Sequence, residues 1–334
     1  MKVLITGANG FIGGFLVEAA MQKGWEVWAG VRKTSDKRYL SQTGLRFIDL
    51  NYSDEAALTL QIRRHVAEFG AWDYIIHNAG TTKCIDEADY HRINYQYTVH
   101  FIEALKQSGV KLSKFLFMSS MGAVGPGNAF TGAPLMITDE PNPISEYGRS
   151  KWLAETYIRS LIDFPWVILR PTGVYGPRDR DYYVMMKMIR HGLNVSLGRK
   201  PQLLNFIFVK DLVTACLLAL ETPIKKRTWF VADGDIYTSD EFSDLLRQVL
   251  KKKNVLSVRI PLSFVKLVSN LSERLSRISG KPSLLNTDKY KVMKQRNWTC
   301  DASDLERDLD FKAAYNLRNG LEETVSWYTE NGWL

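Results

Sequence analysis

The chain has 334 residues, of which 45% are hydrophobic and 24% charged, and its formal net charge is +8. This composition predicts a globular protein with a sizeable core, and no stretch approaches the ~20 apolar residues of a membrane span. The three cysteines are scattered and lack metal-ligand spacing, so we expect reduced thiols in a cytoplasmic protein and no bound metal. The positive charge suggests an anionic partner, either a phosphorylated cofactor or a lipid surface; no nucleic-acid-binding module is recognisable.

The chain begins with a strand–turn–helix pattern. Residues 2–6 form an apolar, β-branched run that predicts a buried strand, and an amphipathic helix follows from Phe11. Three glycines separate them at the spacing G-x-x-G-x-x-G, which permits a sharp turn, close approach of a phosphate and tight helix packing. A second strand at residues 26–31 closes a βαβ unit, so we expect dinucleotide binding at the helix N-terminus. The predicted cofactor contacts of this turn are Gly7, Asn9, Gly10, Phe11, Ile12 and Gly13.

The end of the second strand indicates which nicotinamide cofactor binds. Sites specific for NAD place a carboxylate here for the ribose 2′-hydroxyl, whereas NADP sites use a cation for the 2′-phosphate. The chain has Val31 in place of a carboxylate, followed by Arg32 and Lys33, and its first acid is Asp36. We therefore favour NADP(H) over NAD(H). The alternative is a basic loop that only faces solvent.

Strands and helices continue to alternate up to residue 120. Strands are predicted at residues 45–50, 73–77 and 114–119, with helices from Asp54 and over residues 90–107. This alternation predicts a doubly wound parallel α/β sheet. Further cofactor contacts are expected at the strand ends, from Asp49, Leu50, Asn78, Ala79 and Gly80.

Candidate catalytic residues follow the fifth strand. That strand ends in Ser119 and Ser120, and Tyr147 and Lys151 lie four apart on one face of a predicted helix. An ammonium near the phenol would lower the pKa of Tyr147 toward neutrality and make it a general acid or base for a carbonyl or alcohol. A serine hydroxyl would hold the same substrate oxygen.

The spacing Y-x-x-x-K occurs three times in the chain, so it is weak by itself. The pair Tyr183/Lys187 lies in a Met-rich apolar helix, so we expect it in the hydrophobic core or in a substrate pocket. The pair Tyr290/Lys294 lies in a basic stretch and predicts a solvated face. Only Tyr147/Lys151 follows a serine-ended strand and a Gly-rich loop.

Taken together, these motifs resemble the extended short-chain dehydrogenase/reductases, the superfamily of NAD-dependent epimerases/dehydratases and dihydroflavonol-reductase-like ketoreductases. The resemblance covers nearly the whole chain and implies a Rossmann-type sheet with a smaller C-terminal α/β substrate lobe. The matching segments are residues 6–13, Asp49-Leu50, Asn78-Ala79-Gly80, Asn94, Ser119-Ser120, Tyr147/Lys151, residues 170–177 and residues 208–212.

The resemblance implies roles for individual residues. Tyr147 is similar to the family's proton donor, and Ser120, preferred over Ser119, to the residue that orients the substrate oxygen. Lys151 would lower the tyrosine pKa and hold the nicotinamide ribose, and Asn94 would support a proton-relay water. Pro171 and Val174 belong to the segment that is similar to the family's cover over the nicotinamide. The resemblance also implies residues 1–175, with residues 203–233 returning, as NADP-binding domain, and residues 176–334 as mainly substrate lobe.

Departures from the family pattern bear on the substrate. Met121-Gly122 replaces the acidic pair of the dehydratases, and residues 202–207 lack the arginine that contacts the diphosphate in nucleotide-sugar enzymes. With the apolar run at residues 182–189, this favours NADPH-dependent reduction of a hydrophobic, lipid-like ketone, for example a long-chain keto-amine, another keto-lipid or a sterol-like ketone. The alternatives are a nucleotide-sugar epimerase or reductase and a non-catalytic dinucleotide-binding protein. A cation in the substrate pocket would favour the epimerase; candidates are Arg178, Arg180, Arg199 and Lys200.

The C-terminal lobe carries a basic amphipathic helix, expected over residues 262–278. Its apolar residues lie on one helical face, and Lys266, Arg274 and Arg277 lie off that face. Such a helix either caps the substrate lobe with its apolar face inward or rests on an anionic membrane, so the protein would be cytoplasmic or peripheral at the inner face of the membrane. Trp298, Trp327, Tyr328 and Trp333 predict packing of the C-terminal tail. A homodimer through the helices of Asn94 and Tyr147 is expected by family analogy.

Overall fold

The computed structural model describes residues 1–198, 200–280, 283 and 285–334. The chain divides into two compact units of similar size. Unit 1 comprises Met1–Ala123, Glu146–Arg170 and Val213–Trp229, and unit 2 comprises Val124–Ser145, Pro171–Leu212 and Phe230–Leu334. These units are not the domains expected from the sequence, because residues 124–145 and 203–212 group with unit 2. The division by function therefore stays a prediction.

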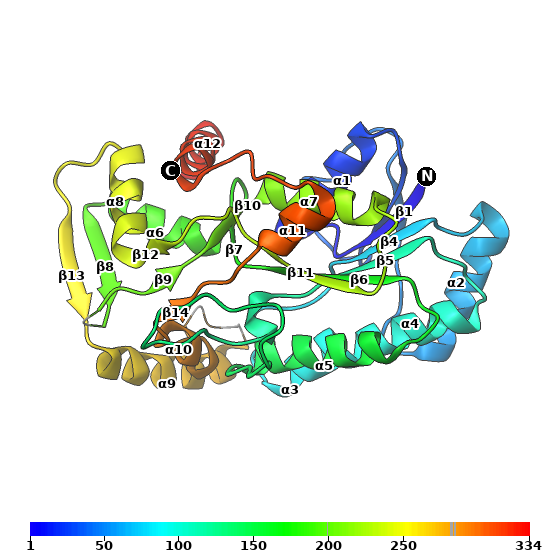
Figure 1. Ribbon diagram of the computed structural model, residues 1–334, viewed down its shortest axis with the longest axis horizontal. Coiled ribbons are helices and arrows are strands. Elements are labelled where there is room, and N and C mark those ends of the chain that lie inside the picture. Colours follow the sequence, from blue (N-terminus) through cyan, green and yellow to red (C-terminus); the bar gives the residue numbers. More distant parts are fainter. Residues whose placement is uncertain (199, 281–282, 284) are drawn as a thin grey trace. The chain divides into compact units, whose positions relative to one another are not determined.

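A seven-stranded sheet forms the centre of unit 1 (Figure 1). Its strand order is β11-β6-β5-β4-β1-β2-β3, and every neighbouring pair from β3 to β6 is parallel. The order reverses between β1 and β4, as in a doubly wound Rossmann sheet. The strands are β1 (Lys2–Thr6), β2 (Glu26–Gly30), β3 (Arg46–Ile48), β4 (Tyr74–His77), β5 (Lys114–Met118), β6 (Trp166–Pro171) and β11 (Arg227–Val231).

Helices cover both faces of this sheet. Figure 1 shows α1 (Phe11–Gln22) and α7 (Val209–Glu221) on one face, and α2 (Glu55–Phe69), α4 (Tyr97–Gln107) and α5 (Glu146–Ser160) on the other. The second face packs a large aromatic and aliphatic core between helices and strands, with Phe101, Phe115 and Ile158 fully buried. The near-continuous apolar strands predicted this arrangement, since a parallel sheet is buried on both sides.

The predicted elements of unit 1 are confirmed with small shifts. The expected strands at residues 26–31, 45–50, 73–77 and 114–119 are each shorter by one to three residues. Asp54 caps α2 by accepting a hydrogen bond from the Ala57 backbone at 2.9 Å. The predicted helix at residues 90–107 begins instead at α3 (Ala88–Tyr90) and contains a π-helical turn, η1 (His91–Gln96), before α4.

Unit 2 consists of short strands and helices around its own core. Three small sheets pair β10 with β7, β9 with both β12 and β14, and β13 with β8. The core includes Tyr328, which stacks on Trp333 at a ring distance of 5.2 Å, so the predicted packing of the C-terminal tail is confirmed. The strands are β7 (Gly173–Tyr175), β8 (Leu193–Leu197), β9 (Leu203–Leu204), β10 (Phe206–Phe208), β12 (Tyr237–Thr238), β13 (Leu256–Ile260) and β14 (Asn297–Trp298). The helices are α6 (Asp181–Arg190), α8 (Ser239–Val249), α9 (Leu262–Ser279), α10 (Thr287–Met293), α11 (Ser303–Leu309) and α12 (Leu317–Glu330).

The cysteines and the helix lengths were both the subject of expectations from the sequence. Cys84, Cys216 and Cys300 are free thiols, and the last two are buried, as expected of core residues. Within the described residues, no helix is long and apolar enough to cross a bilayer.

Candidate active site

The loops after β1 and β4 meet where the strand order of the sheet reverses. Thr6 Oγ1 accepts a hydrogen bond from the Ala79 backbone at 3.0 Å, and Asn78 Nδ2 donates to the Gly7 carbonyl at 3.4 Å. A Cβ atom on Gly7 would lie 2.9 Å from Ala79 Cα, and the φ of 65° at this residue also favours glycine. In open parallel sheets this crevice, at the carboxyl ends of the strands, is the usual place for a ligand.

The glycine turn packs directly against the first helix. A Cβ atom on Gly13 would lie 2.1 Å from the Gly7 carbonyl oxygen, so a larger residue there would displace backbone. Gly10 is the N-cap residue of α1 and has no side chain to satisfy the first backbone N–H groups of the helix. These features fit the pyrophosphate of a dinucleotide, whose charge the helix N-terminus stabilises. The predicted contacts that lie in this turn and the facing β4 loop are Gly7, Asn9, Gly10, Phe11, Ile12, Gly13, Asn78, Ala79 and Gly80.

Basic residues follow β2. Val31 is buried, whereas Arg32 and Lys33 are exposed. Asp36, the first acid after β2, is paired with Arg38 at 2.7 Å. The loop therefore presents cations while its acid is neutralised by a neighbouring arginine.

The end of β3 joins this loop. Asp49 Oδ2 accepts a hydrogen bond from the Lys33 backbone at 3.2 Å, which ties the two strand ends together. Leu50 is buried in the core below, and Asp49 itself is exposed. The adenine contacts expected from these two residues stay a prediction.

Ser120 and Tyr147 lie together after β5 and at the start of α5. The Ser120 hydroxyl hydrogen-bonds to the Tyr147 side chain, and it also accepts a hydrogen bond from the Gly122 backbone at 3.0 Å. A Cβ atom on Gly122 would lie 3.3 Å from Ser120 Oγ and 3.7 Å from two carbons of the Tyr147 ring. Gly122 therefore keeps the space beside both hydroxyl-bearing side chains free, a role that the sequence motifs did not indicate.

The acidity of Tyr147 differs from the prediction. Burial raises the pKa of Tyr147 above its usual value, and the hydrogen bond with Ser120 offsets only part of that rise. Lys151, which was expected to lower this pKa, instead donates to the Met118 carbonyl at 2.8 Å. The phenol is therefore protonated at neutral pH rather than a phenolate.

Lys151 and Asn94 lie next to the β4 loop. A Cβ atom on Gly80 would lie 2.9 Å from Asn94 Oδ1 and 3.3 Å from Lys151 Nζ. Lys151 is 5% exposed, and burial lowers its pKa to about 8 although the nearby Glu155 raises it. The close approach of both side chains to Gly80 indicates a compact cluster of polar groups.

Asn94 is held rigidly on the π-helical turn. Its Oδ1 accepts from the Thr81 backbone at 2.7 Å, and its Nδ2 donates to the Thr81 carbonyl and to Ser150 Oγ, both at 3.0 Å. Ser150 in turn donates to the Tyr147 carbonyl at 2.7 Å. π-helical turns are frequent at functional sites, and this one links the β4 loop to the first turn of α5.

Ser119 belongs to a different, fully buried network. It donates to Glu155 Oε1 at 2.5 Å, and Arg170 Nη2 donates to the other carboxylate oxygen at 2.7 Å. Glu155 and Arg170 are 0% and 1% exposed. The geometry therefore supports the preference for Ser120, because Ser119 is used to anchor β5 against α5 and β6. The Lys151/Glu155 spacing of four residues is the sequence signal for this network.

The remaining predicted residues lie in unit 2. Pro171 ends β6 and Val174 lies in β7, and their predicted contact with the cofactor stays a prediction. Met186 and Ile189 of the Met-rich helix α6 are fully buried, which favours core packing over a substrate pocket. Lys187 lies over the Tyr183 ring at 5.9 Å within the same helix.

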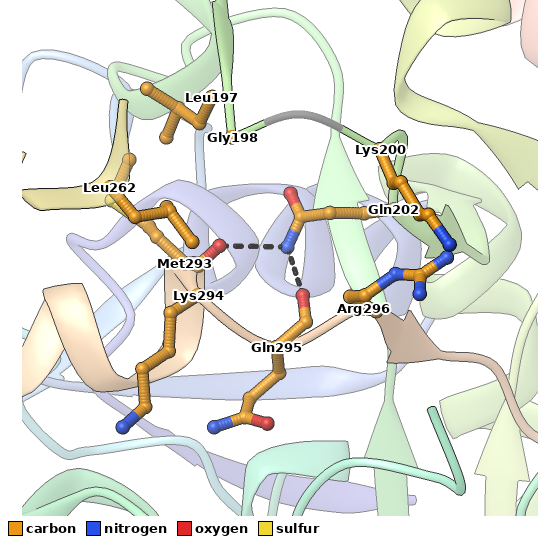
Figure 2. A pocket seen from close by; sticks show the side chains of 9 residues that line it. All are labelled: Leu197, Gly198, Lys200, Gln202, Leu262, Met293, Lys294, Gln295 and Arg296. Atoms are coloured by element: carbon orange, nitrogen blue, oxygen red, sulfur yellow. Dashed lines mark hydrogen bonds between the residues drawn. The ribbon is translucent and has the colours of Figure 1, made fainter. Parts of the chain in front are cut away.

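A cavity of about 260 Å³ lies in unit 2 (Figure 2). Its apolar side is formed by Leu197 and Leu262, and Figure 2 shows the charged ends of Lys200 and Arg296 on the opposite side of Gln202. The cavity is lined by Leu197, Gly198, Lys200, Gln202, Leu262, Met293, Lys294, Gln295 and Arg296. The pair Tyr290/Lys294 was expected on a solvated face. Lys294 instead contributes to the wall of this cavity.

The cations proposed to mark a diphosphate site differ in their surroundings. Lys200 lines this cavity, whereas Arg180 lies over the Trp333 ring at 5.8 Å. Arg178 is half-buried, and Arg199 lies outside the described residues. A cation in a cavity of unit 2 keeps the nucleotide-sugar alternative open.

Residues 3–232 match the family described as NAD dependent epimerase/dehydratase. Among curated relatives, a ceramide reductase of Caulobacter vibrioides is 24% identical over 99% of this chain and 96% of its own length. A UDP-glucose 4-epimerase of Vibrio cholerae is 25% identical (98% and 96%), and a decarboxylating sterol-4-alpha-carboxylate 3-dehydrogenase of Dictyostelium discoideum is 24% identical (96% and 99%).

Solved structures share the fold. A UDP-glucose 4-epimerase of Thermus thermophilus, in complex with NAD, superimposes with a TM-score of 0.78 at 21% identity, covering 98% of this chain and 99% of that one. The matched family covers the strand–turn–helix at the N-terminus and the Ser120/Tyr147 cluster. The chain therefore belongs to the NAD-dependent epimerase/dehydratase family and is an NAD(P)-dependent oxidoreductase of the extended short-chain dehydrogenase/reductase type.

Proposed function

We propose that this protein reduces a hydrophobic, lipid-like ketone to an alcohol with NADPH. The observation that carries the proposal is the hydrogen-bonded pair of Ser120 and Tyr147, with Gly122 keeping the adjacent space open. Such a pair suits a carbonyl oxygen, which accepts hydrogen bonds from both hydroxyl groups.

The raised pKa of Tyr147 favours the reductive direction. The phenol stays protonated at neutral pH and so has a proton to give to the carbonyl oxygen as negative charge develops there. Ser120 donates a second hydrogen bond to the same oxygen. The nicotinamide, when bound, supplies the hydride to the carbonyl carbon.

Lys151 and Asn94 act beside this pair. By the family resemblance, Lys151 holds the nicotinamide ribose. Asn94, whose amide is engaged by Thr81 and Ser150, acts as a positioning residue for the β4 loop and for the first turn of α5. We also propose that Asn94 supports a water molecule that relays protons.

The preference for NADPH rests on the loop after β2. Arg32 and Lys33 are exposed where a 2′-phosphate would lie, and Asp36 is already paired with Arg38. Replacing Arg32 by Asp removes a cation and adds a repelling charge. Arg64→Asp, at an exposed arginine of α2, is the matched control for the change in net charge.

The class of ketone rests on the departures from the family pattern and on two relatives. Met121-Gly122 lacks acidic groups for dehydration, and relatives named as a ceramide reductase and a sterol dehydrogenase act on lipids. Candidates are a long-chain keto-amine, another keto-lipid or a sterol-like ketone. The proposal includes a cytoplasmic location and a homodimer.

A second candidate is a nucleotide-sugar epimerase or reductase. The cations Lys200, Lys294 and Arg296 around the cavity of unit 2 favour it, because a diphosphate requires positive charge. The named UDP-glucose 4-epimerase among the relatives gives it the same level of support. A non-catalytic dinucleotide-binding protein remains the third alternative.

The test is binding of NADPH and NADH, followed by oxidation of NADPH against lipid ketones and nucleotide sugars. We expect tighter binding of NADPH, weakened about tenfold or more by Arg32→Asp and unchanged by Arg64→Asp. Turnover of a lipid ketone supports the proposal. Preference for NADH, or turnover of a nucleotide sugar alone, would overturn it in favour of the epimerase.

A further inference from the structure

Helix α9 turns its apolar side chains outward. Five of its large apolar residues recur three or four positions apart, so they form one stripe along the helix. Their exposed fractions are high: Phe264 54%, Leu267 64%, Leu271 57%, Leu275 57% and Ile278 83%. Of the two arrangements expected for this helix, inward packing is therefore wrong for these five residues, although Val265 of the same predicted face is buried.

The buried face of the same helix is rich in serine. Ser269 and Ser276 are 0% and 6% exposed, and Val265 is the buried aliphatic residue between them and the helix start. Ser269 Oγ donates to the Val265 carbonyl at 2.8 Å, so its polar group is satisfied within the helix. The helix thus has the reverse of the usual amphipathic arrangement, in which large apolar residues face the core.

Positive charge accompanies the stripe. Lys266, Arg274 and Arg277 are exposed on α9. Its single acid, Glu273, accepts hydrogen bonds from the Thr287 hydroxyl at 2.5 Å and from Arg277 at 3.1 Å. A ligand for this surface has to be apolar and negatively charged.

We propose that the outward stripe of α9 docks on the surface of an anionic lipid bilayer, with the helix lying in the plane of the headgroups. An interfacial helix buries its apolar face about 5–10 Å into the headgroup boundary and is held by cations that attract anionic lipid. The stripe runs from Phe264 to Ile278, about 21 Å along the helix axis, and so can lie along a planar surface.

A second copy of the chain fits this surface less well. Stable interfaces use roughly 20–30 residues on each side, whereas the stripe offers five large side chains. A homodimer through α9 would also bring the cations of two copies close together. The bilayer is therefore the occupant that both the apolarity and the charge favour.

The first experiment measures sedimentation with vesicles of phosphatidylcholine, with and without phosphatidylglycerol. We expect binding to the vesicles that contain phosphatidylglycerol, weakened by added salt because the cations are screened. Leu271→Asp should weaken binding about tenfold or more. Leu60→Asp is the matched control, since Leu60 of α2 is 53% exposed and lies outside the stripe, and it should leave binding unchanged.

A second pair of variants tests the charge. Arg274→Gln should weaken binding several-fold, whereas Arg64→Gln on α2 should not. Thermal unfolding of each variant checks that the fold is retained, and Leu267→Asp replaces Leu271→Asp if that chain is unstable. Equal behaviour of the α9 variants and their controls, or the absence of vesicle binding by the unaltered protein, would overturn the proposal.

The remaining outcome is a dimer. If sedimentation velocity shows a dimer that Leu271→Asp dissociates, the stripe is an interface between copies and the bilayer proposal is wrong. Turnover of a water-soluble ketone by Leu271→Asp reports on the reaction separately, so failure of vesicle binding and failure of the proposed activity are distinguishable.

Discussion

Helices α5 and α9 both depart from the ordinary amphipathic arrangement, in which a helix buries apolar side chains and exposes charged ones, but they do so in opposite ways. Helix α5 buries Lys151 and Glu155, and each has partners within unit 1: the Met118 carbonyl for the lysine, Ser119 and Arg170 for the glutamate. Helix α9 instead exposes its large apolar side chains. A buried charge that is fully hydrogen-bonded completes a site inside the protein, whereas an exposed apolar stripe requires something outside it.

Removing the hydroxyl group of Tyr147 on α5 is expected to have the largest effect. Tyr147→Phe should lower kcat for ketone reduction by about 10²–10⁴-fold, because it removes the proton donor. Binding of NADPH, followed by fluorescence, should change little. An unchanged kcat would assign the chemistry to another group and favour a non-catalytic role for this cluster.

Breaking the buried pair of α5 should affect stability more than any change on the α9 stripe. Glu155→Leu leaves the Arg170 guanidinium buried without its carboxylate, so we expect the free energy of unfolding to fall by about 3–5 kcal/mol in urea denaturation. Leu271→Ser, at an exposed position, should change it by less than about 0.5 kcal/mol. Similar losses in the two variants would contradict the contrast between the helices.

The adjacent serines separate chemistry from anchoring. Ser120→Ala should lower kcat by about 10²-fold through loss of a donor to the substrate oxygen, with little change in stability. Ser119→Ala should cost about 1.5–3 kcal/mol of unfolding free energy, because its hydrogen bond goes to a buried carboxylate, and should leave kcat nearly unchanged. The opposite pattern would make Ser119 the catalytic serine.

The buried lysine of α5 should give a pH dependence of stability. Its folded pKa of about 8 lies below the unfolded value of 10.5, so the unfolded chain binds more protons between these values. The cost of burying the charge is therefore full below about pH 8 and disappears as the pH rises toward 10.5.

Lys151→Met should thus gain stability relative to the unaltered protein below about pH 8, and lose that relative gain as the pH rises. Urea denaturation across this range measures the difference. A flat difference would mean that Lys151 is hydrated in the folded protein.

A smaller effect is expected at Gly122. The Cβ atom of Gly122→Ala would lie 3.3 Å from Ser120 Oγ, which would have to shift by a few tenths of an ångström, and 3.7 Å from the Tyr147 ring, an ordinary van der Waals contact. We expect a several-fold loss in kcat with unchanged thermal stability. An unaltered kcat would mean that the space beside the two hydroxyl groups is not used by the substrate.

Local sequence patterns predicted most of the first unit. The apolar strand runs, the glycine spacing and the Asp54 cap depend on neighbours in the chain, and each was found within a few residues of its predicted place. The candidate site was predicted for the same reason, because its serine, tyrosine and lysine follow fixed local signals. The π-helical turn at Asn94 was missed, since it depends on packing that local propensity does not encode.

The sequence by itself determined the alternation of strands and helices and the residue types at the carboxyl ends of the strands. Only the tertiary structure decided that Ser120 rather than Ser119 faces Tyr147, because Ser119 donates its hydrogen bond to Glu155 of α5. It also reversed the expected pKa shift of the tyrosine, since burial depends on what packs around the phenol. The outward face of α9 was decided in the same way: periodicity defines an apolar stripe, but the elements that a helix packs against decide which side becomes the surface.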